Sequence, residues 1–232
     1  MNRSLSTRVK TAFTLTEVLV SMSIFTVLGA MMLALIVGMN WSLFDTQNKS
    51  AIDGNFRTTT STLAQLVSCS DFVYVFTSKI DDPTALAASQ VGPGLAGDYL
   101  VAVYYQYPGQ VDPKTGLMNT TISRIAGVYR LPNAATGEGP IYMFDSARYN
   151  WGVTFPATSD ASVGSVTALL PTAAQSTAFV KLANSAFATD NSGYIFVNTN
   201  GTGAIMLARV RTGFSGKYVS NGYTFSISSR NL

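Results

Sequence analysis

The stretch KTAFTLTEVLVSMSIF, residues 10–25, places a single acid, Glu17, at the edge of a long apolar segment. Residues 18–44 carry no charge at all. About 20 apolar residues suffice to span a bilayer as a helix. A cleaved secretory signal has an apolar stretch of only roughly 7–15 residues. The length therefore predicts a retained membrane helix, and a buried core helix is the alternative.

The charges on either side of this segment predict its orientation. Arg3, Arg8 and Lys10 precede it without any acid, so we expect the N-terminus to stay in the cytoplasm and the C-terminal body to lie outside. Charged residues make up only 12% of the chain. Beyond residue 12 the basic and acidic residues balance, at 12 each. The body is therefore neutral, which does not favour nucleic-acid binding.

Glu17 has two interpretations. A charge at mid-bilayer costs roughly 2.5–3.5 kcal/mol on insertion scales, so its retention calls for a reason. Thr14 and Glu17 have the S/T-x-x-E spacing of a capping box, and an acid suits the start of a helix. The capping box explains Glu17 alone. It leaves the basic leader and the small Ala12 before Phe13 unexplained.

The segment AFTLTEVLVSMSIF, residues 12–25, resembles the class III prepilin signal, in which a short basic leader is followed by F-T-L-x-E and an apolar helix. It is similar to the N-termini of type IV pilins, minor pilins and type II secretion pseudopilins. The resemblance implies that prepilin peptidase cleaves between Ala12 and Phe13 and that the new Phe13 amine is N-methylated. It also implies that Glu17 pairs with the terminal amine of a neighbouring subunit as a filament grows. Ala12 departs from the family, which prefers glycine there.

The resemblance further implies the cellular location of the chain and its partners. These are an inner-membrane anchor, a periplasmic or extracellular C-terminal domain, and a filament of other pilin or pseudopilin subunits built on an inner-membrane assembly platform. The segment lacks the helix proline of many major pilins, and Gly29 and Gly38 are candidate points of local weakness. Ala30, Ala34 and Gly38 repeat every four residues, which is a candidate seam for close helix packing.

Beyond the membrane segment the helix is predicted to continue to about residue 68. Apolar residues at spacings of three, four or eight mark one face, which we expect to pack on a sheet: Trp41, Phe44, Ile52, Phe56, Leu63 and Leu66. Asp45, Lys49, Asp53 and Arg57 lie largely off that face.

After residue 71 the chain becomes rich in β-branched and aromatic residues, as strands are. We predict strands at residues 72–76, 98–107, 123–131, one or two within 140–155, and a final meander at 194–198, 204–212 and 223–228. Loops are expected at residues 81–97, 110–121 and 133–139, and a short helix at about 174–186. Asn200-Gly201 and Asn221-Gly222 are turn signals.

The predicted architecture is α+β and pilin-like, with a long N-terminal helix packed on an antiparallel β-sheet domain. We divide the chain into a cleaved leader (1–12), a membrane and filament-core helix (13–44), an amphipathic continuation (45–70) and a β-rich domain (71–232). The number of strands is closer to a large minor pilin or pseudopilin than to a compact major pilin.

The sequence offers little for catalysis, so we expect no enzyme activity. It has no histidine, and its one cysteine, Cys69, is expected to be buried or inert. Asp81 and Asp82 precede Pro83 in a predicted turn and are interpreted as solvated acids. Residues 190–192 and 198–203 resemble calcium loops but have one nearby carboxylate, so we expect no cofactor, with calcium as the alternative.

A set of basic residues near the C-terminus is interpreted as a basic, solvated hairpin rather than a DNA site: Arg209, Arg211, Lys217 and Arg230.

Two functions are weighed. The first is a structural subunit of a type IV pilus or type II secretion-like filament. The alternative is a single-pass anchored adhesin that does not polymerise, with aromatic side chains available for a ligand at Tyr104, Tyr105, Tyr107 and Trp151.

Overall fold

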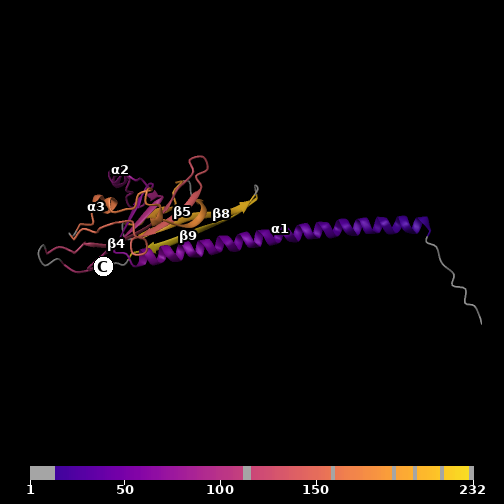
Figure 1. The fold of residues 1–232 in the computed structure, drawn as a ribbon, viewed down its shortest axis with the longest axis horizontal. Helices are drawn as coiled ribbons and strands as arrows, with labels where there is room; N and C mark the ends of the chain where they lie inside the picture. The colour runs from indigo at the N-terminus through magenta and orange to yellow at the C-terminus, as the bar shows by residue number, and fades with distance from the viewer. Residues whose placement is uncertain are drawn as a thin grey trace, which may run out of the picture. The chain divides into compact units, whose positions relative to one another are not determined.

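The computed structural model describes residues 14–111, 116–157, 160–189, 192–200, 203–214 and 217–229. They fall into two compact units, one ending at Gln47 and the other beginning at Asn48. The first unit is helical where it is described. The second contains the rest of that helix and the whole sheet, and Figure 1 traces its elements by residue number.

Helix α1 runs without a break from Leu15 to Ser68. It passes through Gly29, Gly38 and Gly54, so the expected local weakness does not interrupt it. In the second unit its buried residues are Ile52, Thr59, Leu63, Leu66 and Val67, which recur at helical spacing. Trp41 is 46% exposed and takes no part in that face, because it belongs to the first unit.

The described strands form one antiparallel sheet. They are β1 (Phe72–Phe76), β2 (Ala96–Gly97), β3 (Tyr99–Tyr105), β4 (Ile122–Arg130), β5 (Gly139–Asp145), β6 (Val180–Ala188), β7 (Phe196–Asn198), β8 (Gly203–Phe214) and β9 (Lys217–Ser228). Their order is β1-β3-β4-β5-β6-β8-β7-β2, and β9 pairs with β8 outside this path. The fold is therefore α+β, as predicted, with a long apolar N-terminal helix followed by an antiparallel sheet domain.

The two ends of the strand order approach each other. The Val91 N–H donates to the Val75 carbonyl at 2.9 Å, and the Asp98 N–H donates to the Thr77 carbonyl at 3.1 Å. A Cβ atom on Gly97 would lie 2.0 Å from the Phe76 carbonyl oxygen. Only glycine permits this approach between β1 and β2.

Both faces of the sheet are covered. One face forms a core with the C-terminal part of α1, through residues such as Ile52, Leu63 and Leu100. The other face, with Tyr99, Phe144 and Trp151, is covered by α2 (Pro83–Ala88), α3 (Val163–Ala168) and the connecting segments. In Figure 1, α2 and α3 lie on the side of the sheet away from α1. Since Cys69 cannot form an internal disulfide, packing must hold this domain together.

A buried ion pair crosses the interior. Arg130 is 1% exposed and Asp98 2%, and Nη2 of Arg130 donates to Oδ2 of Asp98 at 2.8 Å. Arg130 also donates to the carbonyls of Gly137 and Gly193, while Oδ1 of Asp98 accepts from the Ile195 N–H at 3.1 Å. The pair thus joins the start of β3, the end of β4 and two loops. Burial raises the pKa of Asp98, and the hydrogen bond from Arg130 opposes that shift.

The predicted elements and the observed ones differ in four places. The helix expected at about 174–186 is wrong: a 3-10 turn, Ser176–Ala178, leads into strand β6, because pairing with β5 and β8 outweighs the helix preference of alanine. The loop at 81–97 contains α2 and β2, and α3 was also missed. Asn221-Gly222 lies inside β9, opposite Val210 and Arg209, because β8 and β9 pair along their whole length.

Arg130→Met should lower the free energy of unfolding by about 3–5 kcal/mol, because it leaves Asp98 buried without its partner. The measurement is urea unfolding of the full chain in detergent, followed by circular dichroism. Arg148→Met is the control: Arg148 is 53% exposed and lies 3.5 Å from Asp145, so the loss should be below about 1 kcal/mol. Equal losses in the two variants would contradict the importance of the buried pair.

Candidate functional site

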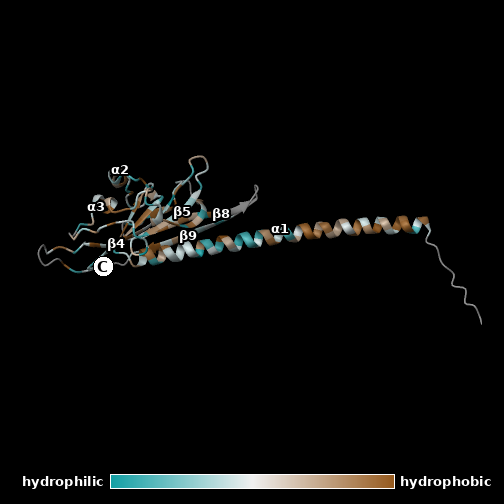
Figure 2. Cartoon of the chain, in the orientation of Figure 1, coloured by the Kyte–Doolittle hydropathy of each residue, from teal (hydrophilic) through white to brown (hydrophobic). Residues whose placement is uncertain are grey.

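The first unit is apolar on every side of its helix. Among the described residues, α1 is the one helix long and apolar enough to cross a membrane, and its apolar window is 0% buried within the protein. Figure 2 shows the change along α1 from hydrophobic residues near its start to hydrophilic ones further on. A helix that is hydrophobic all round needs an apolar environment, which supports membrane anchoring.

The hydroxyl groups within this apolar helix are satisfied locally. Ser21 donates to the Glu17 carbonyl at 2.6 Å, Ser23 to the Leu19 carbonyl at 2.7 Å and Thr26 to the Ser23 carbonyl at 2.8 Å. Hydrogen bonds of this kind to the preceding turn let Ser and Thr enter a nonpolar medium without an unpaired donor.

Glu17 forms the capping box that its spacing with Thr14 predicts. Its Oε2 accepts from the Thr14 N–H and the Thr14 hydroxyl, both at 2.9 Å, and the Glu17 N–H donates to Thr14 Oγ1 at 3.4 Å. These contacts fix the carboxylate at the first turn of α1. Within the described residues, Oε1 receives no hydrogen bond. The carboxylate is therefore half satisfied and can accept from another donor.

The small residues lie along the same helix. Ala30, Ala34 and Gly38 follow one another at four-residue steps, which keeps them near one face of α1. A Cβ atom on Gly29 or on Gly38 would meet nothing within 4 Å. The stripe is open to whatever surrounds the helix.

The comparisons with known proteins address this N-terminal segment. Residues 7–33 match the family model described as the prokaryotic N-terminal methylation motif. The chain carries a class III prepilin signal. A search of curated proteins and a search of solved structures each found no match. Its motif, its long apolar helix and its antiparallel sheet together make it type IV pilin-like or pseudopilin-like.

In this prepilin-like chain the second part of α1 is fixed to strand β9. The Tyr223 ring stacks on Phe56, with centroids 3.4 Å apart and an interplanar angle of 13°. The Tyr223 hydroxyl donates to Oδ1 of Asp53 at 2.6 Å and accepts from Nδ2 of Asn221 at 2.9 Å. Burial and the bond to Asp53 raise the pKa of Tyr223, so the hydroxyl remains a donor at neutral pH.

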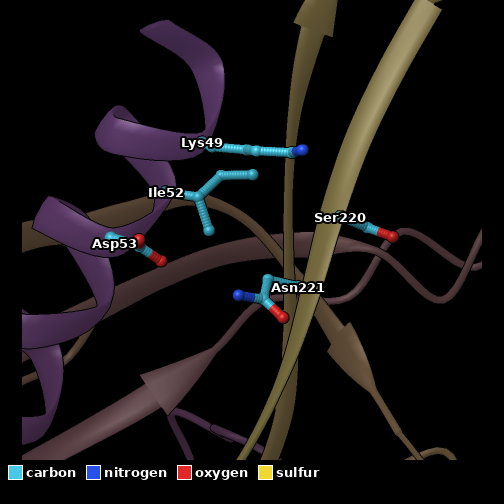
Figure 3. Close-up of a pocket in the computed structure, with 5 residues that line it drawn as sticks. All are labelled: Lys49, Ile52, Asp53, Ser220 and Asn221. Carbon is cyan, nitrogen blue, oxygen red and sulfur yellow. The ribbon is translucent and has the colours of Figure 1, made fainter. Parts of the chain in front are cut away.

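A small hollow of about 210 Å³ lies beside these contacts, lined by Lys49, Ile52, Asp53, Ser220 and Asn221. Figure 3 shows Lys49, Ile52 and Asp53 projecting from α1 toward the strand that carries Asn221. Its lining is small and mixed in character, which suits a contact between helix and strand better than a reactive site.

The end of α1 is tied to the sheet from a second side. The Tyr104 hydroxyl donates to the Leu66 carbonyl at 2.5 Å, which satisfies one of the last carbonyls of the helix. The Arg124 guanidinium lies 4.5 Å from the Tyr104 ring centre and makes a bidentate pair with Asp145 at 2.8 and 2.7 Å. The hydrogen bonds that Arg124 donates to Asp145 raise the pKa of Arg124.

Some of the site residues predicted from the sequence lie outside the described residues. Ala12, Phe13 and the leader lie outside the described residues, as do Asp190, Asn191 and Arg230. Cys69 was expected to be buried or inert. It is exposed, because it falls just past the end of α1, so the first of these two expectations is wrong.

The aromatic and acidic candidates are mostly structural. Tyr104 and Trp151 are buried, and only Tyr107, at 43% exposed, is freely available. Asp82 caps α2 by accepting from the Thr84 N–H at 2.8 Å. The Asp82-Pro83 pair is a helix-start signal that could have located α2. Arg209 lies over the Phe187 ring, and the side chains of Arg211 and Lys217 are not described.

Tyr223→Phe should lower the free energy of unfolding by about 0.5–1.5 kcal/mol, because the stack on Phe56 remains while the hydroxyl bonds are lost. Urea unfolding of the full chain measures the difference, with Tyr107→Phe as the matched exposed control. If the two variants are equally stable, the bond between Tyr223 and Asp53 does not hold the helix to the sheet.

Proposed function

We propose that the chain is a minor pilin or pseudopilin, a structural subunit of a type IV pilus or type II secretion-like filament. The observation that carries this proposal is the match of residues 7–33 to the methylation motif, with Glu17 at the start of a helix exposed on all sides. In this proposal prepilin peptidase cleaves between Ala12 and Phe13, and the Phe13 amine is methylated.

Glu17 then guides entry into the filament. Its carboxylate keeps one oxygen on Thr14 and offers the other to the terminal ammonium of a neighbouring subunit. The structure moderates the cost of holding this acid in the membrane, because the local cap supplies two donors before any partner arrives. In the filament, the terminal ammonium of the neighbouring subunit becomes a positively charged donor to Glu17. A charged donor forms stronger hydrogen bonds than a neutral one. The pairing thus favours the assembled helix over the lone subunit.

The rest of the chain has supporting roles. Arg3, Arg8 and Lys10 hold the leader on the cytoplasmic side, where the peptidase and the assembly platform act. Ala30, Ala34 and Gly38 allow neighbouring α1 helices to pack closely in the filament core. The sheet domain lies in the periplasm or outside the cell, and it performs no catalysis and needs no cofactor.

Glu17→Ala should leave membrane insertion unchanged and reduce incorporation into filaments at least about tenfold, the effect of about 1.4 kcal/mol of lost pairing. Immunoblots of membranes and of sheared filaments measure both quantities in the cell.

Glu17→Gln is the matched control, because glutamine preserves the capping box but removes the charge. We expect it to fail in assembly as Glu17→Ala does. Normal filament levels of Glu17→Gln would show that the cap alone matters, and normal levels of both variants would end the assembly role of Glu17.

A further inference from the structure

An open pocket lies on the face of the sheet that α1 does not cover. Its volume is about 420 Å³, within the range of roughly 300–1,000 Å³ typical of small-ligand sites. It is called the Tyr142 pocket here, and its lining residues are Lys79, Asp81, Tyr129, Leu131, Tyr142, Ala173, Ser176 and Phe179. They come from strands β4 and β5, from the chain after β1 and from the segment before β6.

Aromatic rings form one wall. Tyr129 and Tyr142 are stacked, with centroids 5.4 Å apart and an interplanar angle of 21°, and Phe179 meets Tyr129 edge-on at 5.4 Å. Tyr129 is only 4% exposed, whereas Tyr142 is partly exposed. Phe179 is partly exposed as well. A ligand therefore reaches Tyr142 and Phe179, and Tyr129 packs behind them as the ring that contacts both.

Lys79 contributes donors from within this aromatic surface. Its ammonium lies 5.7 Å from the Tyr129 ring centre and 5.2 Å from that of Phe179, and its side chain is 7% exposed. It donates to Oδ1 of Asp81 at 2.5 Å. An ammonium has three donors, and among the described residues the other two have no acceptor. A desolvated ammonium in this state favours an oxygen from a ligand.

Asp81 supplies the complementary acceptor. Its Oδ1 accepts from Lys79 and from the Ala173 N–H at 3.0 Å, while the side chain is 49% exposed. Within the described residues its Oδ2 accepts no hydrogen bond. The hydrogen bond from Lys79 lowers the pKa of Asp81, so the carboxylate is ionised at neutral pH.

We propose that the Tyr142 pocket binds one neutral pyranose ring of a glycan. A pyranose has a face of C–H groups, which suits an aromatic wall, and a rim of hydroxyls that both donate and accept. Lys79 and Asp81 present unused donors and an acceptor side by side at such a rim. Because the two charges cancel, the pocket does not attract an anion, and Asp81 repels one.

This assignment is separate from the role in a filament. The pocket uses no residue of α1, and Glu17 and the methylation motif lie in the other unit. Glycan binding can therefore fail while filament assembly stands, and the reverse also holds.

Saturation-transfer NMR on the full chain tests the proposal, in a zwitterionic detergent that has no sugar head group. The probes are methyl β-D-galactopyranoside and methyl β-D-glucopyranoside. We expect transfer to the ring C–H protons of at least one, reduced at least about fivefold in Tyr142→Ala and in Asp81→Asn. Asp81→Asn keeps the shape of the side chain and an oxygen that can accept from the Lys79 ammonium and the Ala173 N–H, so it keeps the test valid if Tyr142→Ala folds poorly.

Tyr107→Ala is the control, since it removes an exposed tyrosine elsewhere and should leave the signal unchanged. Sodium glucuronate and sodium benzoate serve as an anionic sugar and a planar aromatic anion, and both should give weaker signals. The proposal is overturned if neither neutral pyranoside shows transfer, if the variants and the control lose signal alike, or if benzoate or glucuronate binds better.

Discussion

The structure depends on one constraint: the apolar surface of the N-terminal part of α1 cannot remain exposed to water. Residues 18–44 have no charge, and the apolar 18-residue window of α1 is 0% buried within the protein. Such a surface must meet lipid or other helices. Glu17 is tolerable at the edge of this helix because Thr14 supplies two hydrogen bonds to its carboxylate.

The sheet domain that follows the apolar helix must be stable without an internal disulfide. Both faces of the sheet are buried, and charged residues inside it are paired, as with Arg130 and Asp98 or Arg124 and Asp145. Tyr104 and Tyr223 then fasten residues of α1 to β3 and β9 through hydrogen bonds, and in the case of Tyr223 through ring stacking as well. The part of α1 that follows Asn48 is thereby held by two strands of the sheet.

The local sequence pattern was sufficient to predict a strand where tertiary contacts favour the same structure. Phe72–Phe76 forms the strand expected of it, and Tyr223, Phe225 and Ile227 turn to the buried side of β9 while Thr224 and Ser226 are exposed. It failed where distant partners decide: the alanine-rich residues of β6 become a strand between β5 and β8, and Asn221-Gly222 is held extended by β8. The contact between Thr14 and Glu17 could be predicted from the sequence because it spans three residues. The Tyr142 pocket could not be predicted, because Lys79, Tyr129 and Phe179 are far apart in the chain.

The most direct test of the account is the N-terminal residue and its mass in protein isolated from native membranes. If the prepilin signal is processed, the chain begins at Phe13 with one methyl group on its amine, the product of cleavage after Ala12. A chain that begins at Met1, with the bond between Ala12 and Phe13 intact, would contradict the account. The motif would then have no processing role, and Glu17 would serve only to cap the helix.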